Sequence, residues 1–192
     1  MSRCLDTCTL GAVSILKSKI VKLTTTALLI GIGILLPMVI PTIMIPPASY
    51  TIGVHVPIFV AMFISPWMAI AVTFGTTIGF FFSAPLVIVW RAASHLIFVI
   101  PAVLYISKAN KAELKGFKLR ILSFLIAIMH AVAETIAVLT FYMATVFPSG
   151  QGMWWVVSFI GFGTIIHSML DFEIANVVRR ALERAGFLGV LR

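Results

Sequence analysis

The chain has 192 residues, of which 61% are hydrophobic and only 10% are charged. An ordinary soluble domain has roughly a quarter charged residues, so this composition excludes a water-soluble globular fold. The net charge is +8, but no aromatic residues interleave the basic clusters, which argues against a nucleic-acid partner. We expect an all-α polytopic membrane protein with about six transmembrane helices of roughly 20 residues each.

The N-terminal segment, residues 1–19, is predicted to be cytoplasmic. It contains Cys4 and Cys8 beside basic residues. A single CxxxC pair is a poor metal site, so we interpret them as ordinary thiols. A removable signal peptide is not expected, because the apolar stretch is broken and no clear small-residue cleavage site follows it.

The first three spans are separated by proline-marked breaks. The first is predicted at residues 23–43 and is followed by a structured loop, IPPASYTIG, at 45–53. A short second span runs from residue 55 to ISPW (64–67), where a proline breaks the helix. The third span, 67–83, ends at the turn SAP.

The last three spans are predicted at residues 86–106, 121–147 and 154–178. A basic loop at 107–120 separates the first two of them, and a basic tail follows at 179–192. The positive-inside rule then places both termini and this loop in the cytoplasm, with every Lys and Arg except Arg91. We expect one transmembrane domain over residues 1–192.

The predicted outer segments carry aromatic residues and no charge. Tyr50 lies in the first outer loop, and Trp154 and Trp155 lie in PSGQGMWW at 148–155. Such residues either anchor helices at the headgroup level or form a lid over a ligand pocket.

Ionisable residues inside the spans are costly and usually line an interior or pair with one another. Three pairs have a spacing of four, which places both members on one helix face: Arg91 with His95, His130 with Glu134, and His167 with Asp171. For His130, His167 and Asp171, interhelical packing is the favoured interpretation. Arg91 is a candidate ligand contact. Glu134 is either a ligand contact or a partner of Arg91 or His95.

Enzyme motifs are absent from the sequence. It has no HExxH, no GxSxG and no GxxxxGK[ST], so it lacks a known metalloprotease motif, a nucleophile elbow and its own P-loop ATPase. We expect no enzyme, no catalytic or metal-binding residues and no cofactor. A small secondary transporter, or an intramembrane enzyme that uses His130 and Glu134, remains an alternative.

The stretch HVPIFVAMFISPWMAIAVTFGTTIGFFFS, residues 55–83, resembles the second and third spans of S-components, the substrate-binding subunits of energy-coupling factor vitamin transporters. The resemblance covers roughly residues 20–180. It implies high-affinity vitamin capture in a prokaryotic plasma membrane, with a scaffold transmembrane subunit and two ABC-type ATPases as separate partner chains. The AxxxA-like docking surface of the family corresponds here to Ala27 and Gly31, and packing of this helix on its own bundle is the alternative.

The resemblance also implies a pocket in the outer half of the membrane. Mapped onto this chain, the substrate-binding residues are expected to be Tyr50, His55, Trp90, Arg91, His95, Glu134, Trp154 and Trp155. Aromatic faces would stack on a planar ring, and Arg91 and Glu134 would pair with polar groups. Cobalamin is the slightly favoured vitamin, and niacin or pantothenate, whose carboxylate would suit Arg91, is the alternative.

Overall fold

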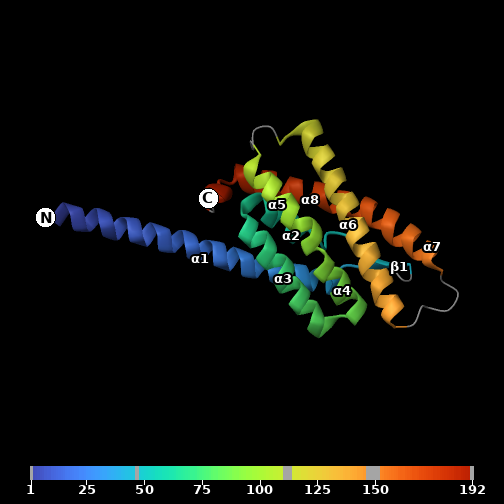
Figure 1. Ribbon diagram of the computed structural model, residues 1–192. Helices are drawn as coiled ribbons and strands as arrows, with labels where there is room; N and C mark the ends of the chain where they lie inside the picture. Colours follow the sequence, from blue (N-terminus) through green and yellow to red (C-terminus); the bar gives the residue numbers. More distant parts are fainter. Residues whose placement is uncertain (1, 46–47, 110–113, 146–151, 191–192) are drawn as a thin grey trace.

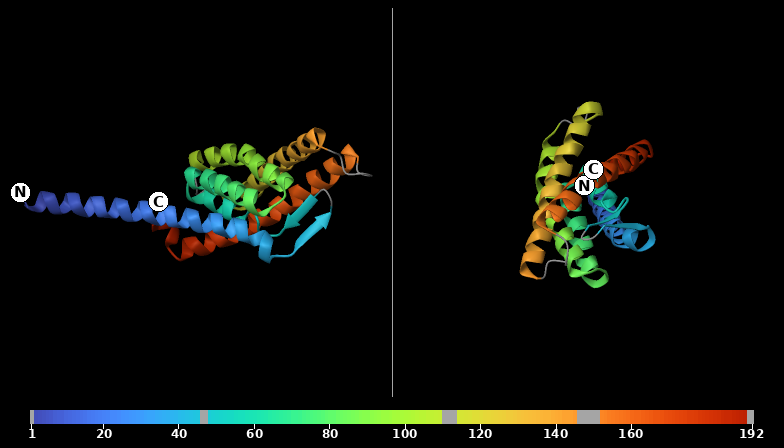
Figure 2. Two further views of the ribbon diagram at one scale, coloured as in Figure 1. Left: turned by 90° about the horizontal axis from the view of Figure 1, so that it is seen from below. Right: turned by 90° about the vertical axis from the view of Figure 1, so that its right-hand side faces the viewer.

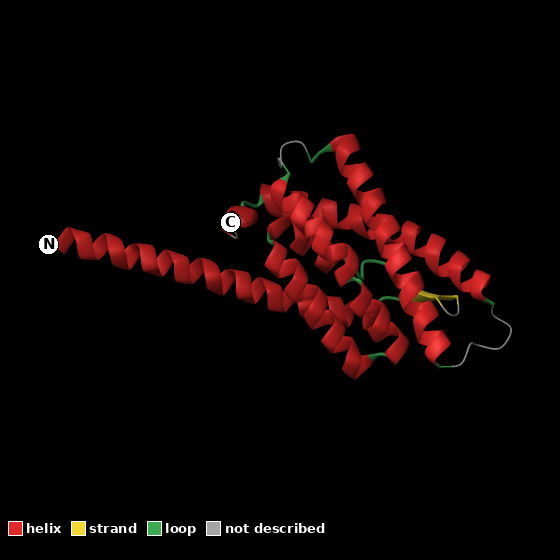
Figure 3. Ribbon diagram, viewed as in Figure 1, coloured by secondary structure: helices red, strands yellow, loops and turns green. Residues whose placement is uncertain are grey.

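The computed structural model describes residues 2–45, 48–109, 114–145 and 152–190, with side chains from residues 16 to 189 within these ranges. In chain order the elements are α1 (Ser2–Val39), β1 (Thr42–Ile45), β2 (Ala48–Thr51), α2 (Val56–Ile64), α3 (Pro66–Ser83), α4 (Leu86–Ser94), α5 (Leu96–Lys108), α6 (Gly116–Ala144), α7 (Met153–Val156), the π-helix η1 (Val157–Phe162), α8 (Gly163–Arg184) and α9 (Phe187–Val190). The described chain is helical apart from short connections and one small β-hairpin (Figure 3).

Within the described residues, five helical stretches are long and apolar enough to cross a membrane. They are residues 16–39 of α1, then α3, α4 with α5, α6, and α7 through α8. The predicted second span is α2, which has nine residues. At 1.5 Å per residue it is about 14 Å long and reaches only halfway across a ~30 Å hydrocarbon core. The all-α membrane fold is confirmed, with α2 as a half-span.

The β-hairpin departs from the predicted first span. The helix ends at Val39, and β1 pairs antiparallel with β2, with Ile43 opposite Tyr50. Pro41 explains the early end, because proline disfavours helix at the preceding residue and lacks an N–H. Three of the four residues of β1 are β-branched, which favours a strand. Residues 46–47 of the predicted loop lie outside the described residues.

The predicted fourth span is divided at His95 into α4 and α5. The His95 N–H bonds to the Ala92 carbonyl three residues earlier, at 3.2 Å. This tight turn interrupts the α-helical pattern and leaves His95 buried, with 7% of its surface exposed. Pro101 lies inside α5 and removes one further helical N–H.

The later helices differ from the prediction at their ends. α6 begins at Gly116, inside the predicted basic loop, and α8 continues to Arg184, into the predicted tail. The last span also contains η1, a stretch of π-helix, which sequence patterns do not reveal. Such π-segments occur often at functional sites.

The short helix α2 lies at the centre of the bundle, against α1, α3, α5 and α8. Its residues from Pro57 to Phe63 are all buried, which explains why it is apolar on every side. Phe59 of α2 packs edge-on against Phe172 of α8, with ring centroids 5.3 Å apart. In lipid such contacts act through close packing, because apolar helices gain little from leaving the hydrocarbon.

The two ends of the bundle differ. The N-terminal half of α1 extends beyond the bundle on the side where the C-terminal helix ends, and the β-hairpin lies at the opposite end (Figures 1 and 2). The C-terminal end of α5 and the N-terminal end of α6 lie toward the same end as the termini (Figure 1). This places the predicted cytoplasmic segments together, away from the hairpin.

Candidate functional site

A cavity of about 480 Å³ lies under the β-hairpin, between the hairpin and the adjacent ends of α1, α3 and α4. Its walls are mainly apolar, and its polar lining includes five ionisable side chains: His55, Arg91, His95, Glu134 and His167. Small-molecule sites are typically roughly 300–1,000 Å³, with apolar walls and few placed polar groups. This cavity has that size and that lining.

Arg91 and Glu134 form a two-pronged ion pair at the cavity. Arg91 Nε lies 3.2 Å from Glu134 Oε1, and Arg91 Nη2 lies 3.1 Å from Oε2. Thr164 of α8 donates to the same Oε2 at 2.7 Å. Arg91 Nη1 donates to Ser49 Oγ of the hairpin at 3.1 Å. The pair therefore connects α4, α6, α8 and β2.

Asp171, which is fully buried in α8, holds the start of α2. Its carboxylate accepts the backbone N–H groups of Gly53 at 2.6 Å and His55 at 3.0 Å. The His55 ring Nδ1 lies 3.0 Å from Asp171 Oδ2. A carboxylate at a helix N-terminus satisfies free N–H groups and favours the helix dipole. Gly53 adopts a φ of +89°, which only glycine accepts easily.

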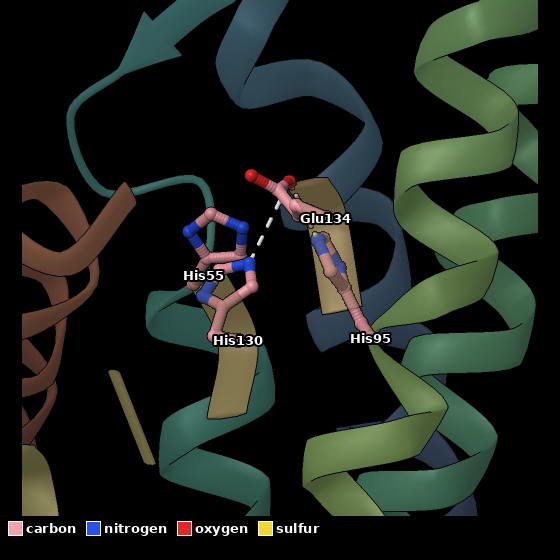
Figure 4. A group of neighbouring side chains, drawn as sticks. All are labelled: His55, His95, His130 and Glu134. Atoms are coloured by element: carbon pink, nitrogen blue, oxygen red, sulfur yellow. Dashed lines mark hydrogen bonds and ion pairs between the residues drawn. The ribbon is translucent and has the colours of Figure 1, made fainter. Parts of the chain in front are cut away.

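Four histidines come together beside these carboxylates. The ring of His55 lies 4.8 Å from that of His95, 4.6 Å from His130 and 5.0 Å from His167, centroid to centroid. The rings meet edge to face at 69° to 79°. Figure 4 shows the rings of His55, His95 and His130 gathered around the carboxylate of Glu134. The residues drawn in Figure 4 come from three separate parts of the chain, namely the start of α2, the α4–α5 turn and α6.

Tyr50 lies next to the cavity and faces η1. Its hydroxyl donates to the Phe159 carbonyl, while its strand neighbours Ser49 and Thr51 line the cavity. Burial raises the pKa of Tyr50, so the phenol stays protonated and remains a donor. Gly163 makes room for the ring, because a Cβ there would lie 2.6 Å from Tyr50 Cζ.

The three tryptophans of the predicted site lie elsewhere. Trp90 is half exposed, with its Nε1 3.3 Å from Thr140 Oγ1, and Trp154 is 76% exposed. The Trp155 ring packs on Phe159, with centroids 4.1 Å apart. Within the described part of the chain, none of the three lines the cavity. Their contact with a ligand stays a prediction.

Two contacts of the site were missed by sequence reasoning. Ser49 and Thr164 each bond to the Arg91–Glu134 pair, but an uncharged hydroxyl in an apolar chain carries no distinctive signal. His167 and Asp171 did carry a signal, their spacing of four. His167 lines the cavity, and Asp171 supports it through its contact with His167 Nε2, in addition to connecting helices.

The predicted docking residues lie on the open side of α1. Ala27 is exposed, and a Cβ at Gly31 would meet no described atom within 4 Å. The opposite side of α1 packs on α3, where a Cβ at Gly33 would lie 3.0 Å from Thr76 Oγ1. The small-residue pair is therefore not used for contact between α1 and α3.

The chain is 36% identical over 174 residues to the niacin transporter NiaX of Lactococcus lactis subsp. cremoris (strain MG1363). The match covers 88% of this chain and 78% of that protein. The chain belongs to the S-component family of energy-coupling factor vitamin transporters. No protein-family profile and no solved structure matches this S-component. It is a multi-pass protein of a prokaryotic plasma membrane, and its family serves vitamin uptake.

Proposed function

We propose that this S-component captures niacin outside the cell and delivers it through an ATP-driven importer. The similarity to a niacin transporter supports this choice of vitamin, and it gives no support to cobalamin, which the sequence alone slightly favoured. The observation that carries the proposal is an arginine, Arg91, placed at a mainly apolar cavity. Niacin is a planar pyridine ring with one carboxylate, and a guanidinium is the side chain best suited to a carboxylate.

The guanidinium of Arg91 is shared between Glu134 and the hairpin residue Ser49. Nε and Nη2 are engaged by Glu134, while Nη1 donates to Ser49 Oγ at 3.1 Å and to the Ser49 carbonyl at 3.5 Å on the cavity wall. Of the guanidinium nitrogens, Nη1 is the one that Glu134 does not hold. We infer that the niacin carboxylate binds at Nη1 and Ser49, and that His55 and His95, which line the cavity, border the pyridine ring. Tyr50, which faces η1, would hold the hairpin in place. Glu134 then holds Arg91 in position and neutralises it when no vitamin is bound.

The importer requires partners that this chain does not supply. S-components act with a scaffold transmembrane subunit and ATPases, and we propose two ABC-type ATPases and docking through Ala27 and Gly31. We also propose that the hairpin end faces outward. Residues 1–19, 107–120 and 179–192 would then face the cytoplasm, where their positive charges belong.

Uptake by cells tests the proposal. A niacin-auxotrophic host receives the chain together with its scaffold and ATPase subunits, and the uptake of radiolabelled nicotinate is measured. We expect uptake that disappears when the P-loop lysines of the ATPases are replaced. Nicotinamide, which lacks the carboxylate, should compete poorly. Uptake that persists without active ATPases, or competition by cobalamin in place of nicotinate, would contradict the proposal.

A further inference from the structure

The side chains of His55, His95, His130 and Glu134 are arranged like the ligands of a metal ion. One ligand atom from each of them lies within 4.8 Å of all the others, and all four residues are buried. They come from the start of α2, the α4–α5 turn, and two successive turns of α6. In Figure 4 the three rings and the carboxylate point toward one shared region. Imidazole and carboxylate together suit zinc and neighbouring transition metals.

His130 gives independent evidence that a partner belongs here. Its side chain is completely buried, and neither ring nitrogen makes a hydrogen bond to any described residue. Its Nε2 lies 3.6 Å from Glu134 Oε1, too far for a good hydrogen bond. Buried polar atoms are nearly always satisfied, so an imidazole with two unpaired nitrogens requires an explanation. A cation coordinated by the lone pair of Nε2 supplies one for that nitrogen.

The spacing of the ligand atoms matches a small divalent ion. Two ligands that are each about 2.1 Å from a tetrahedral ion lie roughly 3.4 Å apart. Glu134 Oε1 is 3.2 Å from His95 Nε2 and 3.6 Å from His130 Nε2. These two separations lie on either side of that value, and the remaining ligand atoms of the group lie within 4.8 Å of one another.

The surrounding residues orient these groups as a second shell does. Asp171 contacts Nδ1 of His55 and so directs its Nε2 toward the cluster, as in carboxylate–histidine–metal arrangements. A carboxylate has about four acceptor positions. Arg91 takes two on Glu134, Thr164 takes one, and the fourth, on Oε1, faces His95 Nε2 at 3.2 Å. A cation would bind at this fourth position, between Oε1 and His95 Nε2, in place of their hydrogen bond.

We propose that a divalent transition-metal ion of the zinc class binds between His55, His95, His130 and Glu134. The ion provides a second positive centre beside Arg91 at the cavity. This second half of the proposal rests on the proposed function, because it assigns the ion to the binding of a carboxylate-bearing vitamin. The intramembrane histidines are then metal ligands in addition to packing residues.

Metal binding is tested without vitamin. The full-length, tag-free chain is stripped with a chelator in detergent and titrated with Zn²⁺ by calorimetry, and Co²⁺ is added separately for its visible absorption. We expect one ion per chain and an intense tetrahedral Co²⁺ spectrum. His130→Gln and His95→Gln should each weaken Zn²⁺ binding by at least about 100-fold, and Asp171→Asn by about 10–100-fold. Ser123→Ala, at another buried polar residue of α6, should leave it unchanged.

The outcomes separate the ion from the vitamin. The metal site would be overturned if the wild-type chain did not bind Zn²⁺ stoichiometrically. It would also be overturned if both histidine variants bound Zn²⁺ with the affinity of the wild-type chain. Nicotinate is titrated into the same stripped and Zn²⁺-loaded samples, and we expect at least 10-fold tighter binding with Zn²⁺. Equal nicotinate affinity in both samples would overturn the role of the ion and leave the proposed function standing. Zn²⁺ binding without any nicotinate binding would overturn the proposed function and leave the metal site standing.

Discussion

At the scale of single residues, the Arg91–Glu134 pair is the central feature of the site. Removing one partner of a buried ion pair leaves an uncompensated charge and typically costs about 3–5 kcal/mol. Sequence reasoning found both residues, since ionisable groups in spans are rare and usually functional. It also paired His130 with Glu134 by their spacing of four and expected His55 in the same pocket. It did not find that the rings of His55 and His130 contact each other, because they meet across different helices and no spacing along the chain records that contact.

Replacing Arg91 by lysine tests the carboxylate contact while keeping the positive charge. Lysine cannot hold Glu134 through two nitrogens and still present a third to the cavity. A charged hydrogen bond contributes about 1.5–3 kcal/mol, so we expect Arg91→Lys to weaken nicotinate binding by roughly 10–100-fold in a calorimetric titration. Arg180→Lys, at an exposed arginine of α8, is the matched control. Unchanged nicotinate affinity in Arg91→Lys would move the carboxylate away from Arg91.

Gly163→Ala tests whether Tyr50 must pack closely on η1. The new Cβ would lie 2.6 Å from Tyr50 Cζ, so the ring and the hairpin must shift. Overpacking of this kind costs about 1–3 kcal/mol, and we expect a lower unfolding temperature and weaker nicotinate binding. Gly161→Ala is the control, because its Cβ would meet only Thr135 Oγ1, at 3.8 Å. Equal behaviour of the two variants would show that the Tyr50 contact does not shape the site.

At the scale of secondary-structure elements, α2 and the hairpin position the site. The short α2, its end just before Pro66 and its apolar character were read correctly from the sequence. The hairpin and η1 were not, because four-residue strands and single π-turns have almost no periodicity to detect. The division of the fourth span at His95 was also missed, since proline at 101 is the only break signal nearby.

Asp171→Asn tests the attachment of α2 to α8. The amide keeps the size of the side chain. It loses the negative charge of the carboxylate that accepts hydrogen bonds from the backbone N–H groups of Gly53 and His55. Loss of charge-assisted bonds predicts a destabilisation of about 2–4 kcal/mol. At about 2–4 °C per kcal/mol, the midpoint of thermal unfolding should fall by roughly 5–15 °C. An unchanged midpoint would mean that the start of α2 is held by its own packing.

The two faces of α1 make opposite predictions. Gly31 lies on the open face, so Gly31→Leu should leave nicotinate binding by the isolated chain intact and block uptake by the assembled importer. Gly33 faces Thr76 of α3, so Gly33→Leu should disturb the fold itself and weaken binding by the isolated chain. Normal uptake with Gly31→Leu would remove this face of α1 from the docking surface.

At the scale of the whole molecule, the two ends of the bundle have different chemistry. The end with the N-terminal part of α1, the end of α5, the start of α6 and the end of α8 carries most of the positive charge of the described residues, and the hairpin end carries the cavity. Composition and charge clusters were enough to predict the membrane class and this polarity. They could not predict the size of the cavity or its ligand, because these depend on how α1, α3, α4 and the hairpin meet in space.

The most direct test of the whole account is a calorimetric titration of the purified chain, alone in detergent with Zn²⁺ present, against nicotinate, nicotinamide, pantothenate and cobalamin. We predict tight one-to-one binding of nicotinate, with nicotinamide at least about 10-fold weaker because it lacks the charge that Arg91 recognises. Tight binding of cobalamin or pantothenate with no heat from nicotinate would contradict the niacin assignment. If none of the four compounds gave a heat of binding, the account of the chain as a subunit that captures a vitamin on its own would be contradicted.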